Sequence, residues 1–119
     1  MSSASKRKGT NFEREVITYL RQHGYPYADR PVAGASEDVG DIIGTPGVVW
    51  ECKNQKIMQL ALWVDELEVE IAHNLARYQV ESPVTGAVIH KRRGKSSAGD
   101  YYATLPLYRY VQLLKEAGY

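Results

Sequence analysis

Three charged residues, Asp41, Glu51 and Lys53, have the types and spacing of a catalytic site. Side chains alternate between the two faces of a β-strand, so a strand through Glu51 and Lys53 presents a carboxylate and an amine together. A hairpin would bring Asp41, ten positions earlier, beside Glu51. Two carboxylates at that approach repel one another unless a cation lies between them, and hard oxygen ligands favour Mg²⁺ or Mn²⁺. The spacing therefore predicts a divalent-metal site.

Phosphodiester hydrolysis is the chemistry that such a site suits. It needs charge stabilisation on a phosphoryl oxygen, an activated water and help for the leaving oxygen, which one or two ions can provide. Lys53 would orient the attacking water or stabilise the transition state. Gln55 falls on the same strand face, where it could equally be a solvated amide at the strand end. A plain surface pair also stays open for Glu51 and Lys53, because Glu-x-Lys is a common tripeptide.

Short strands with a turn between them must position these side chains. Residues 38–44 (DVGDIIG) and 48–55 (VVWECKNQ) are separated by the turn signal TPG, which predicts a hairpin. Before it, residues 25–32 have extended character and 33–38 are typical of a loop.

A helix is predicted over residues 10–23, because its apolar residues recur at helical spacing and Gly24 supplies a stop. Thr10 and Glu13 fit a capping box, in which Glu13 returns a hydrogen bond to the helix start. This structural job is an alternative to any chemical role of Glu13.

A second helical pattern covers residues 57–81 and draws one apolar stripe that would pack on the sheet or on another subunit. The stripe consists of Ile57, Leu60, Val64, Leu67, Ile71, Leu75 and Tyr78. The acidic block of this helix, Asp65, Glu66, Glu68 and Glu70, is expected to point away from nucleic acid, since phosphates would be repelled there.

The C-terminal part predicts a strand hairpin and a last helix. Residues 84–93 form one strand, 94–99 the tip and 100–106 the returning strand, and the helix begins near Pro106. The predicted order is therefore α-β-β-β-α-β-β-α, a mixed α/β fold.

Composition bounds the organisation of the chain. With 119 residues, 44% of them hydrophobic, the chain suits one domain over residues 10–119, preceded by a flexible basic arm over residues 1–9. The net charge is only +1, but basic residues gather in two clusters that could contact phosphates or could simply be solvated surface charge. These clusters are Lys6, Arg7 and Lys8, and Lys91, Arg92, Arg93 and Lys95.

Several classes of protein are disfavoured. The single cysteine, Cys52, leaves no internal disulfide and no cysteine-rich zinc site, and the three histidines lack ligand spacing. No stretch has the length of a membrane span, and the N-terminus lacks the apolar region of a secretory signal. We therefore expect a cytoplasmic protein of an archaeal, bacterial or phage-infected cell, with no membrane and no small-molecule cofactor. Trp63 and the tyrosines are expected in a core or subunit contact in preference to base stacking.

The combination of motifs resembles the PD-(D/E)xK nuclease superfamily, with Gly40-Asp41 before Glu51-x-Lys53 and without the proline that names the motif. It further resembles archaeal-type Holliday-junction resolvases and their phage relatives. That likeness covers roughly residues 6 to 56, through KRKGTNFERE, the Gly24-Tyr25 turn, Arg30 and the small-residue loop ending in Ser36. Later segments (WVDELEVE, HKRRGK, GDYYATLP) are similar to actinobacteriophage proteins of the same group.

The resemblance implies a restriction-endonuclease-like mixed β-sheet flanked by helices, and it assigns roles. Asp41 and Glu51 would bind the metal, Glu13 would add an acidic group near it, and Lys53 would be the catalytic lysine. Arg30 and Ser36 would contact the scissile strand, although the loop length around them differs among members.

Together these features predict a Mg²⁺-dependent endonuclease that cuts branched DNA, chiefly four-way junctions. Paired cuts need two sites related by a two-fold axis, so a homodimer is expected, with the apolar stripe of helix 57–81 as its surface. Two alternatives remain open. One is a nicking, flap-cutting or restriction-like nuclease with the same site, and the other is a catalytically silent DNA-binding or assembly protein.

Overall fold

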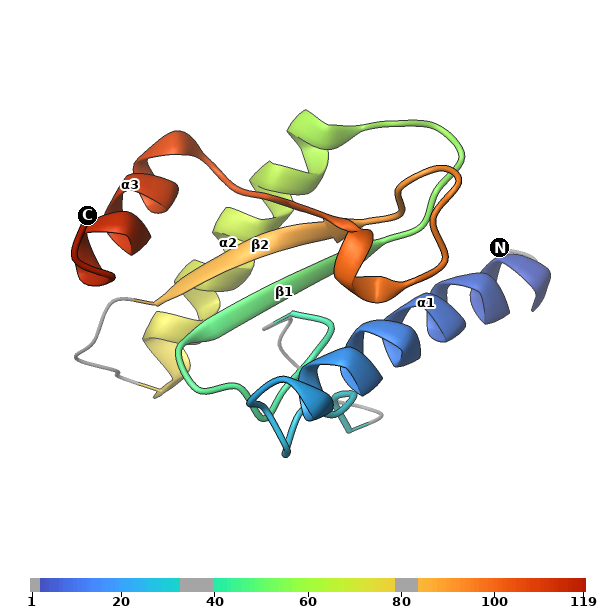
Figure 1. Cartoon of the computed structure of the whole chain (residues 1–119), viewed down its shortest axis with the longest axis horizontal. Helices are drawn as coiled ribbons and strands as arrows, with labels where there is room; N and C mark the ends of the chain where they lie inside the picture. The colour runs from blue at the N-terminus through green and yellow to red at the C-terminus, as the bar shows by residue number, and fades with distance from the viewer. Residues whose placement is uncertain (1–2, 33–39, 79–83) are drawn as a thin grey trace.

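A computed structural model describes residues 3–32, 40–78 and 84–119. In these ranges the chain forms three α-helices around a three-stranded sheet (Figure 1), which confirms the mixed α/β class. The elements are α1 (Ser3–Gln22), β1 (Val48–Lys53), α2 (Leu60–Tyr78), β2 (Thr85–His90), the 3-10 turn η1 (Ala98–Asp100), β3 (Tyr102–Thr104) and α3 (Leu107–Glu116).

The sheet has the order β1-β2-β3. β1 and β2 run parallel and are joined through α2, whereas β2 and β3 form an antiparallel pair, as the C-terminal hairpin pattern predicts. The register sets Glu51 opposite Val88 and Lys53 opposite His90. β2 is therefore central, and one edge of β1 faces away from the sheet.

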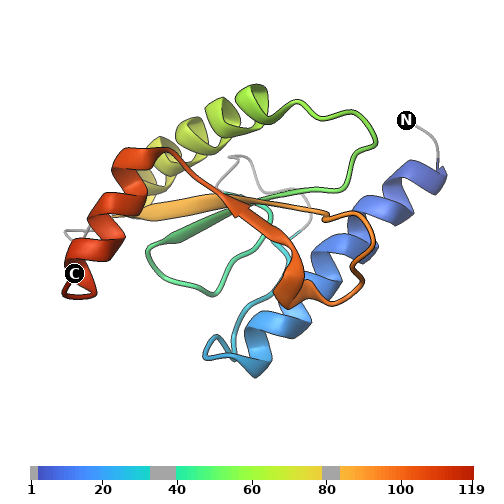
Figure 2. The same ribbon diagram turned by 45° about the horizontal axis from the view of Figure 1, so that its top comes forward.

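Helices cover both faces of this sheet (Figure 2). On one face α1 packs its buried side chains, among them Phe12 and Val16, against Ile89 of β2. On the other face α2 packs Trp63 and Leu67 against β1 and β2. The alternating side chains of β1 thus enter two different cores: Val49 lies with α2, and Trp50 packs against the α1 core.

The first helix differs from the sequence expectation. α1 begins at Ser3 instead of Thr10, so the flexible arm expected over residues 1–9 is helical from Ser3 onward. Thr10 and Glu13 consequently lie inside the helix, and the predicted capping box does not exist. Gly9 has no neighbour that a Cβ would meet, and a single glycine costs a helix only about 1 kcal/mol.

The expected strands before β1 are also reduced. In the described residues the segments 25–32 and 40–44 meet only at an isolated bridge between Asp29 and Ile43. The loop expected at 33–38, including Ser36, and the first part of the strand expected at 38–44 lie outside the described residues. The hairpin geometry survives near Asp41, whose backbone N–H donates to the Trp50 carbonyl at 2.8 Å.

The apolar stripe of the second helix is used in the core. α2 begins at Leu60, after the expected start at residue 57, and its expected end beyond Tyr78 falls outside the described residues. Trp63 is buried, as expected, and Leu67 and Ile71 are fully covered by the sheet. The expectation that this stripe supplies a dimer surface is therefore wrong, because its centre already packs inside one chain.

The helices described here include none with the length and apolar character needed to cross a membrane.

Candidate active site

Asp41 lies along the outer edge of β1. Its backbone N–H donates to the Trp50 carbonyl, and its own Oδ2 accepts a hydrogen bond of 2.7 Å from the Cys52 N–H. The strand thereby holds both the backbone and the carboxylate of Asp41. This edge is the one that β2 does not occupy.

Glu51 and Lys53 project together from β1 toward α2, as strand alternation predicts. The carboxyl group of Glu51 is almost fully buried, and the residue is only 5% exposed. Its Oε1 lies 3.2 Å from Lys53 Nζ, whereas its Oε2 is buried and accepts no hydrogen bond from any described residue. A buried carboxylate oxygen without a donor is costly, so this atom is suited to a cation.

Burial and the neighbouring acids raise the pKa of Asp41 in this site. Burial, followed by the negative charge of Glu51, raises the pKa of Asp41 to about 7, against an ordinary 3.8. Burial by itself would lower the pKa of Lys53, but its hydrogen bonds to Glu66 and Glu51 outweigh that effect and raise it. Lys53 is therefore a stable cation at neutral pH, while Asp41 is close to its titration midpoint.

Glu13 approaches the site from α1. Arg30 Nε donates to its Oε2 at 3.1 Å, yet burial still raises the pKa of Glu13, with a further contribution from the charge of Glu51. Because Glu13 is in the interior of α1, the competing capping role is removed. The structure thus brings Glu13, Asp41, Glu51 and Lys53 into one electrostatic cluster, with Arg30 beside it.

Glu66 of α2 is a member of this cluster that the sequence reasoning missed. Its Oε2 lies 2.9 Å from Lys53 Nζ, closer than the Glu51 oxygen. The acidic block is expected to point away from nucleic acid, which stays a prediction, and one of its members, Glu66, contacts Lys53. A signal was present: Glu66 follows Trp63 by three residues and precedes Leu67, so it shares the side of the helix that faces the sheet.

His90 is the second neighbour that the sequence did not indicate. It pairs with Lys53 in the β1–β2 register and is buried, with one ring nitrogen 2.8 Å from Thr104 Oγ1. Burial lowers the pKa of His90, so the neutral imidazole is favoured. Lys53 consequently has an uncharged neighbour on its strand-partner side.

The remaining predicted residues are spread more widely. Gln55 is exposed two positions beyond the end of β1. Lys6, Arg7 and Lys8 are exposed on the first turns of α1, and Arg92, Arg93 and Lys95 are exposed after β2. Lys91 differs from its neighbours, because its Nζ lies 3.0 Å from the Tyr101 hydroxyl.

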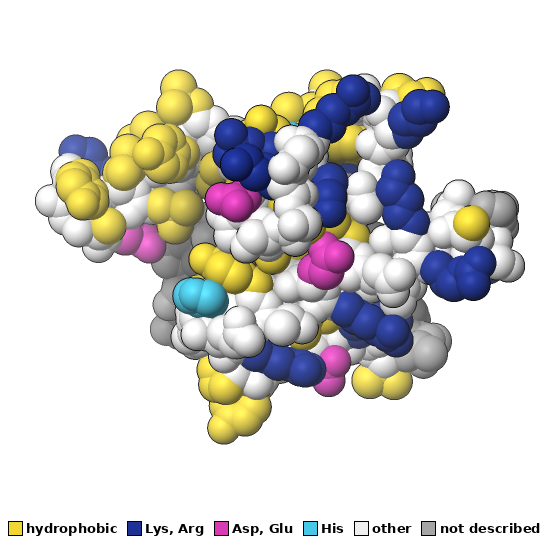
Figure 3. All heavy atoms as spheres, turned by 45° about the vertical axis from the view of Figure 1, so that its right-hand side comes forward, with side chains coloured by type: hydrophobic (Ala, Val, Ile, Leu, Met, Phe, Trp, Pro, Cys, Tyr) yellow, Lys and Arg dark blue, Asp and Glu magenta, His cyan; other side chains and the backbone are white. Residues whose placement is uncertain are grey.

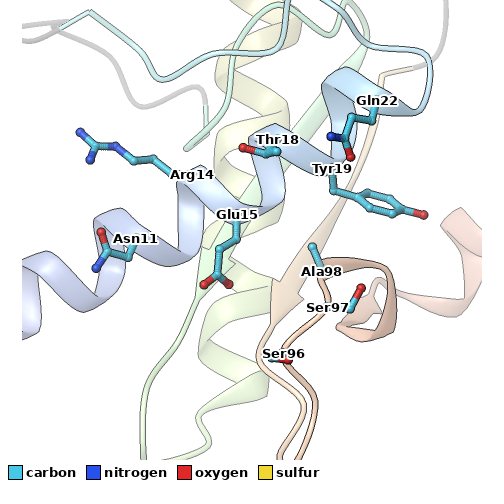
Figure 4. Close-up of a pocket in the computed structure, with 9 residues that line it drawn as sticks. All are labelled: Asn11, Arg14, Glu15, Thr18, Tyr19, Gln22, Ser96, Ser97 and Ala98. Carbon is cyan, nitrogen blue, oxygen red and sulfur yellow. The ribbon is translucent and has the colours of Figure 1, made fainter.

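A hollow lies between α1 and the segment that leads into η1 (Figure 4). It is lined by Asn11, Arg14, Glu15, Thr18, Tyr19, Gln22, Ser96, Ser97 and Ala98. Glu15 accepts a hydrogen bond of 2.5 Å from the Tyr101 hydroxyl, which ties the basic segment after β2 to α1. Figure 3 shows lysine and arginine side chains spread over this side of the molecule.

The charges of the cluster fit a bound cation. Among the described residues, four carboxylates, those of Glu13, Asp41, Glu51 and Glu66, face two cations, Lys53 and Arg30. Within residues 3–32, 40–78 and 84–119, no three acidic, histidine or cysteine side chains are placed as a ready-made metal cage. Asp41 and Glu51 are the pair that would hold an ion, since Glu51 has the unused buried oxygen and Asp41 the raised pKa.

A mixed sheet between helices, with this acid and lysine cluster at the edge of one strand, defines a protein of the restriction-endonuclease-like class. The chain matches the family described as archaeal Holliday junction resolvase (Hjc) over residues 4–95, well over half of its length, and it belongs to that family. Membership makes it a nuclease of the Holliday junction resolvase kind. Neither the curated proteins nor the solved structures compared with the chain gave a match.

Proposed function

We propose that this protein is a Mg²⁺-dependent endonuclease that resolves four-way DNA junctions by phosphodiester hydrolysis. One observation carries the proposal: Lys53 is paired with the buried Glu51, and the charge of Glu51 acts in turn on Asp41 at the strand edge. Lys53 is therefore a fixed cation beside two carboxylates, those of Asp41 and Glu51, whose negative charge one further cation would balance. The family match supports the junction as the substrate.

Each residue of the cluster has a proposed part in hydrolysis. Asp41 and Glu51 would hold a Mg²⁺ ion, which Mn²⁺ could replace, and the ion would supply charge stabilisation at the phosphoryl oxygen. Lys53 directs its ammonium group toward the phosphate and the attacking water. The water oxygen bonds to phosphorus and gives up a proton, one P–O ester bond breaks, and the leaving oxygen takes up a proton, so that one water molecule is consumed. Glu13 and its hydrogen-bond partner Arg30 lie beside the proposed position of the ion and the phosphate.

The exposed basic side chains bind the DNA in this proposal. Lys6, Arg7 and Lys8 on α1 and Arg92, Arg93 and Lys95 after β2 are exposed, so they can contact phosphates. None of these contacts reads a base, which suits recognition of a branched shape. Two copies, one for each of the strands to be cut, complete a symmetric resolvase.

The test is cleavage of a synthetic four-way junction with Mg²⁺, beside a linear duplex and a flap of the same sequences. Paired nicks on the junction alone support the proposal. Equal cutting of the flap or the duplex would instead favour a nicking or restriction-like nuclease with the same site. Absence of cutting with any divalent metal, together with firm junction binding, would leave a non-catalytic binding protein.

Lys53→Ala is the variant that connects the cutting to this site. Removing the ammonium group should lower the single-turnover rate by roughly 10²-fold to 10³-fold, the usual loss for one transition-state stabilising group. The affinity for the junction, measured by gel shift in Ca²⁺, should stay within about twofold of the wild-type value, because other basic side chains contact the DNA phosphates. Cleavage at the wild-type rate would contradict the assignment.

A further inference from the structure

Two large apolar side chains, Ile57 and Met58, are exposed on the connection between β1 and α2. Ile57 is 70% exposed and Met58 60%. Ile57 belongs to the apolar stripe that predicts the second helix, yet α2 begins only at Leu60, and the core under α2 does not include it. Packing inside the chain therefore does not account for these two neighbours, which we call the apolar tip.

The apolar tip lies close to the proposed active site. β1 ends at Lys53, and Ile57 follows four residues later. An extended chain advances at most about 3.6 Å for each residue, so the Cα atoms of Lys53 and Ile57 are at most roughly 14 Å apart. Neighbouring nucleotides of a DNA strand are about 3.4 Å apart along the helix axis. A strand with one phosphate at Lys53 therefore has the tip within about four base steps.

Basic side chains of α1 lie beside the start of this connection. Asn54, the first residue after β1, lines a hollow together with Arg7 and Lys8. Lys56, which directly precedes the tip, is exposed. These cations can bind phosphates next to the tip.

The segment after β2 adds further cations. Because β1 and β2 are parallel, the connections that follow them leave the same end of the sheet (Figures 1 and 2). The Lys91 N–H donates to the Lys53 carbonyl at 3.3 Å, so the two connections start side by side. Arg92 and Arg93 follow Lys91 and are exposed. The end of the sheet that carries Lys53 thus combines phosphate-binding cations with two exposed apolar side chains.

We propose that Ile57 and Met58 insert as an apolar wedge into the base stack at the branch point of the DNA. The inference rests on the proposed function, because the bound strand has to bring a phosphate to Lys53. Isoleucine and methionine are among the side chains that DNA-binding proteins insert between base steps. Separating bases costs least where pairing and stacking are already interrupted, as at a branch point. The wedge therefore favours branched DNA over a linear duplex without reading a base.

The first experiment follows base unstacking directly. The fluorescent base 2-aminopurine, which emits more strongly when it is unstacked, replaces one base beside the branch point in each of four otherwise identical junctions, and Ca²⁺ replaces Mg²⁺ to prevent cutting. The wild type should raise the emission at least about twofold in one or more of these junctions. The double variant Ile57→Thr/Met58→Gln, the tip variant, should give less than about half of that rise, because its polar side chains favour water over a base stack.

Val69→Thr/Leu75→Gln is the matched control, since it makes the same kind of change at two apolar residues of α2. Val69 is 54% exposed and Leu75 42%, and both lie in the later part of α2, away from the connection that carries the tip. All four substitutions are at exposed positions, so the folds should be retained, which circular dichroism checks. The control should match the wild type. A wild type without a rise in any junction, or a tip variant with the full rise, overturns the inference.

Affinity gives a second measure of the wedge. In Ca²⁺, fluorescence anisotropy should show the tip variant binding the junction roughly fivefold to tenfold more weakly than the wild type, because the inserted apolar contacts are lost. The affinity for a linear duplex of the same sequences should stay within about twofold, because Lys56 and the other cations are retained. Equal losses on the junction and the duplex would contradict insertion at the branch point.

An anionic lipid surface is another partner that apolar side chains beside cations can bind. The position of the tip directly after the strand of Lys53 favours DNA, because a membrane bound there would lie against the proposed active site. Sedimentation with vesicles of phosphatidylserine and phosphatidylcholine tests this alternative. Co-sedimentation that only the tip variant loses, without a fluorescence rise in any junction, would assign the tip to lipid and overturn the inference.

Cleavage in Mg²⁺ separates this inference from the proposed function. If the wild type gives the fluorescence rise in Ca²⁺ and the tip variant does not, but no junction is cut in Mg²⁺, the hydrolytic function fails and the wedge stands. If the junction is cut while the tip variant still gives the full rise, the wedge fails alone.

Discussion

A carboxyl group whose pKa lies near neutrality makes the site sensitive to protons, and it would make the proposed metal binding depend on pH. Asp41, with its pKa raised to about 7 from 3.8, holds its proton in the folded chain over a range in which the unfolded chain has already lost it. As the pH rises from about 4 to about 7, the metal-free fold therefore loses stability. A cation that replaces the proton reverses this loss.

The first prediction follows from this loss of stability with rising pH. Mg²⁺ should raise the midpoint of thermal unfolding more at pH 8 than at pH 5.5, because the ion competes with the Asp41 proton only at the lower pH. Differential scanning fluorimetry with and without saturating Mg²⁺ measures both shifts. Asp41→Asn should show a small shift that is equal at both pH values. A wild-type shift that is independent of pH would contradict the role of Asp41.

Glu66 gives a second prediction at the level of one side chain. Glu66→Gln weakens the closest anchor of Lys53 Nζ, so we expect a severalfold lower single-turnover cleavage rate with unchanged junction affinity. The alkaline limb of the rate against pH should also move to lower pH, since the Glu66 bond raises the pKa of Lys53. Asp65→Asn, which removes an exposed acid next to Glu66, is the control. Identical pH profiles for the two variants would exclude a positioning role.

The segment that carries Asp41 depends on a close backbone crossing. Gly44 has φ +84°, and a Cβ placed there would overlap the Tyr27 carbonyl oxygen. Gly47 has nearly the same φ, +81°, but nothing lies within 4 Å of its Cβ position. A comparison of substitutions at the two glycines thus distinguishes the cost of backbone strain from the cost of steric overlap.

The third prediction uses this pair. Gly47→Ala should cost about 1 to 2 kcal/mol from the left-handed conformation alone. Gly44→Ala meets the same strain and also the Tyr27 backbone, so it should lower the unfolding midpoint by at least ~10 °C more and impair metal binding. Thermal unfolding of both variants and of the wild type measures this. Equal losses in the two variants would mean that the crossing is not tightly packed.

Sequence patterns predicted the elements best where periodicity and packing agree. The alternation of β1 correctly placed Glu51 and Lys53 on one face, and the strand pair β2 and β3 and the start of α3 were found from their turn and proline signals. The start of α1 was missed because Gly9 and the charged residues before it have no apolar period, although nothing prevents them from continuing the helix.

The site was predictable in its strand residues and not in its tertiary partners. The Glu66 contact with Lys53 and the burial that raises the Asp41 pKa both depend on how α2 and the segment before β1 lie against the sheet. The same uncertainty affected the apolar stripe of α2: its period shows that one face is covered, but not whether a sheet or a second chain covers it. Asp41 was expected on a strand and instead follows the edge of one.

The whole molecule is nearly neutral, yet its charges are separated. The net charge is +1, while basic side chains spread over one side of the molecule (Figure 3) and three acids of α2, Glu66, Glu68 and Glu70, are at least half-buried. Binding to DNA should therefore depend on salt far more strongly than the net charge suggests.

The fourth prediction concerns that salt dependence. Replacing Arg92, Arg93 and Lys95 together by Ala should weaken junction binding and reduce the slope of log K against log salt by up to ~3, about 0.9 for each phosphate that a basic side chain no longer neutralises. Lys91→Ala alone should change the slope less and the stability more, because its ammonium group is held by Tyr101. Fluorescence anisotropy at four salt concentrations gives the slopes. An unchanged slope in the triple variant would remove this segment from the interface.

The bond between Asp41 and the Cys52 N–H has a meaning for solubility as well as for chemistry. An edge strand with free N–H and C=O groups invites pairing with a strand of another molecule, which is a common start of aggregation. At β1 the backbone N–H of Asp41 donates a hydrogen bond to the Trp50 carbonyl, and the Asp41 carboxylate accepts a hydrogen bond from the Cys52 N–H. The acid proposed to hold the metal therefore also closes the edge of the sheet against such growth.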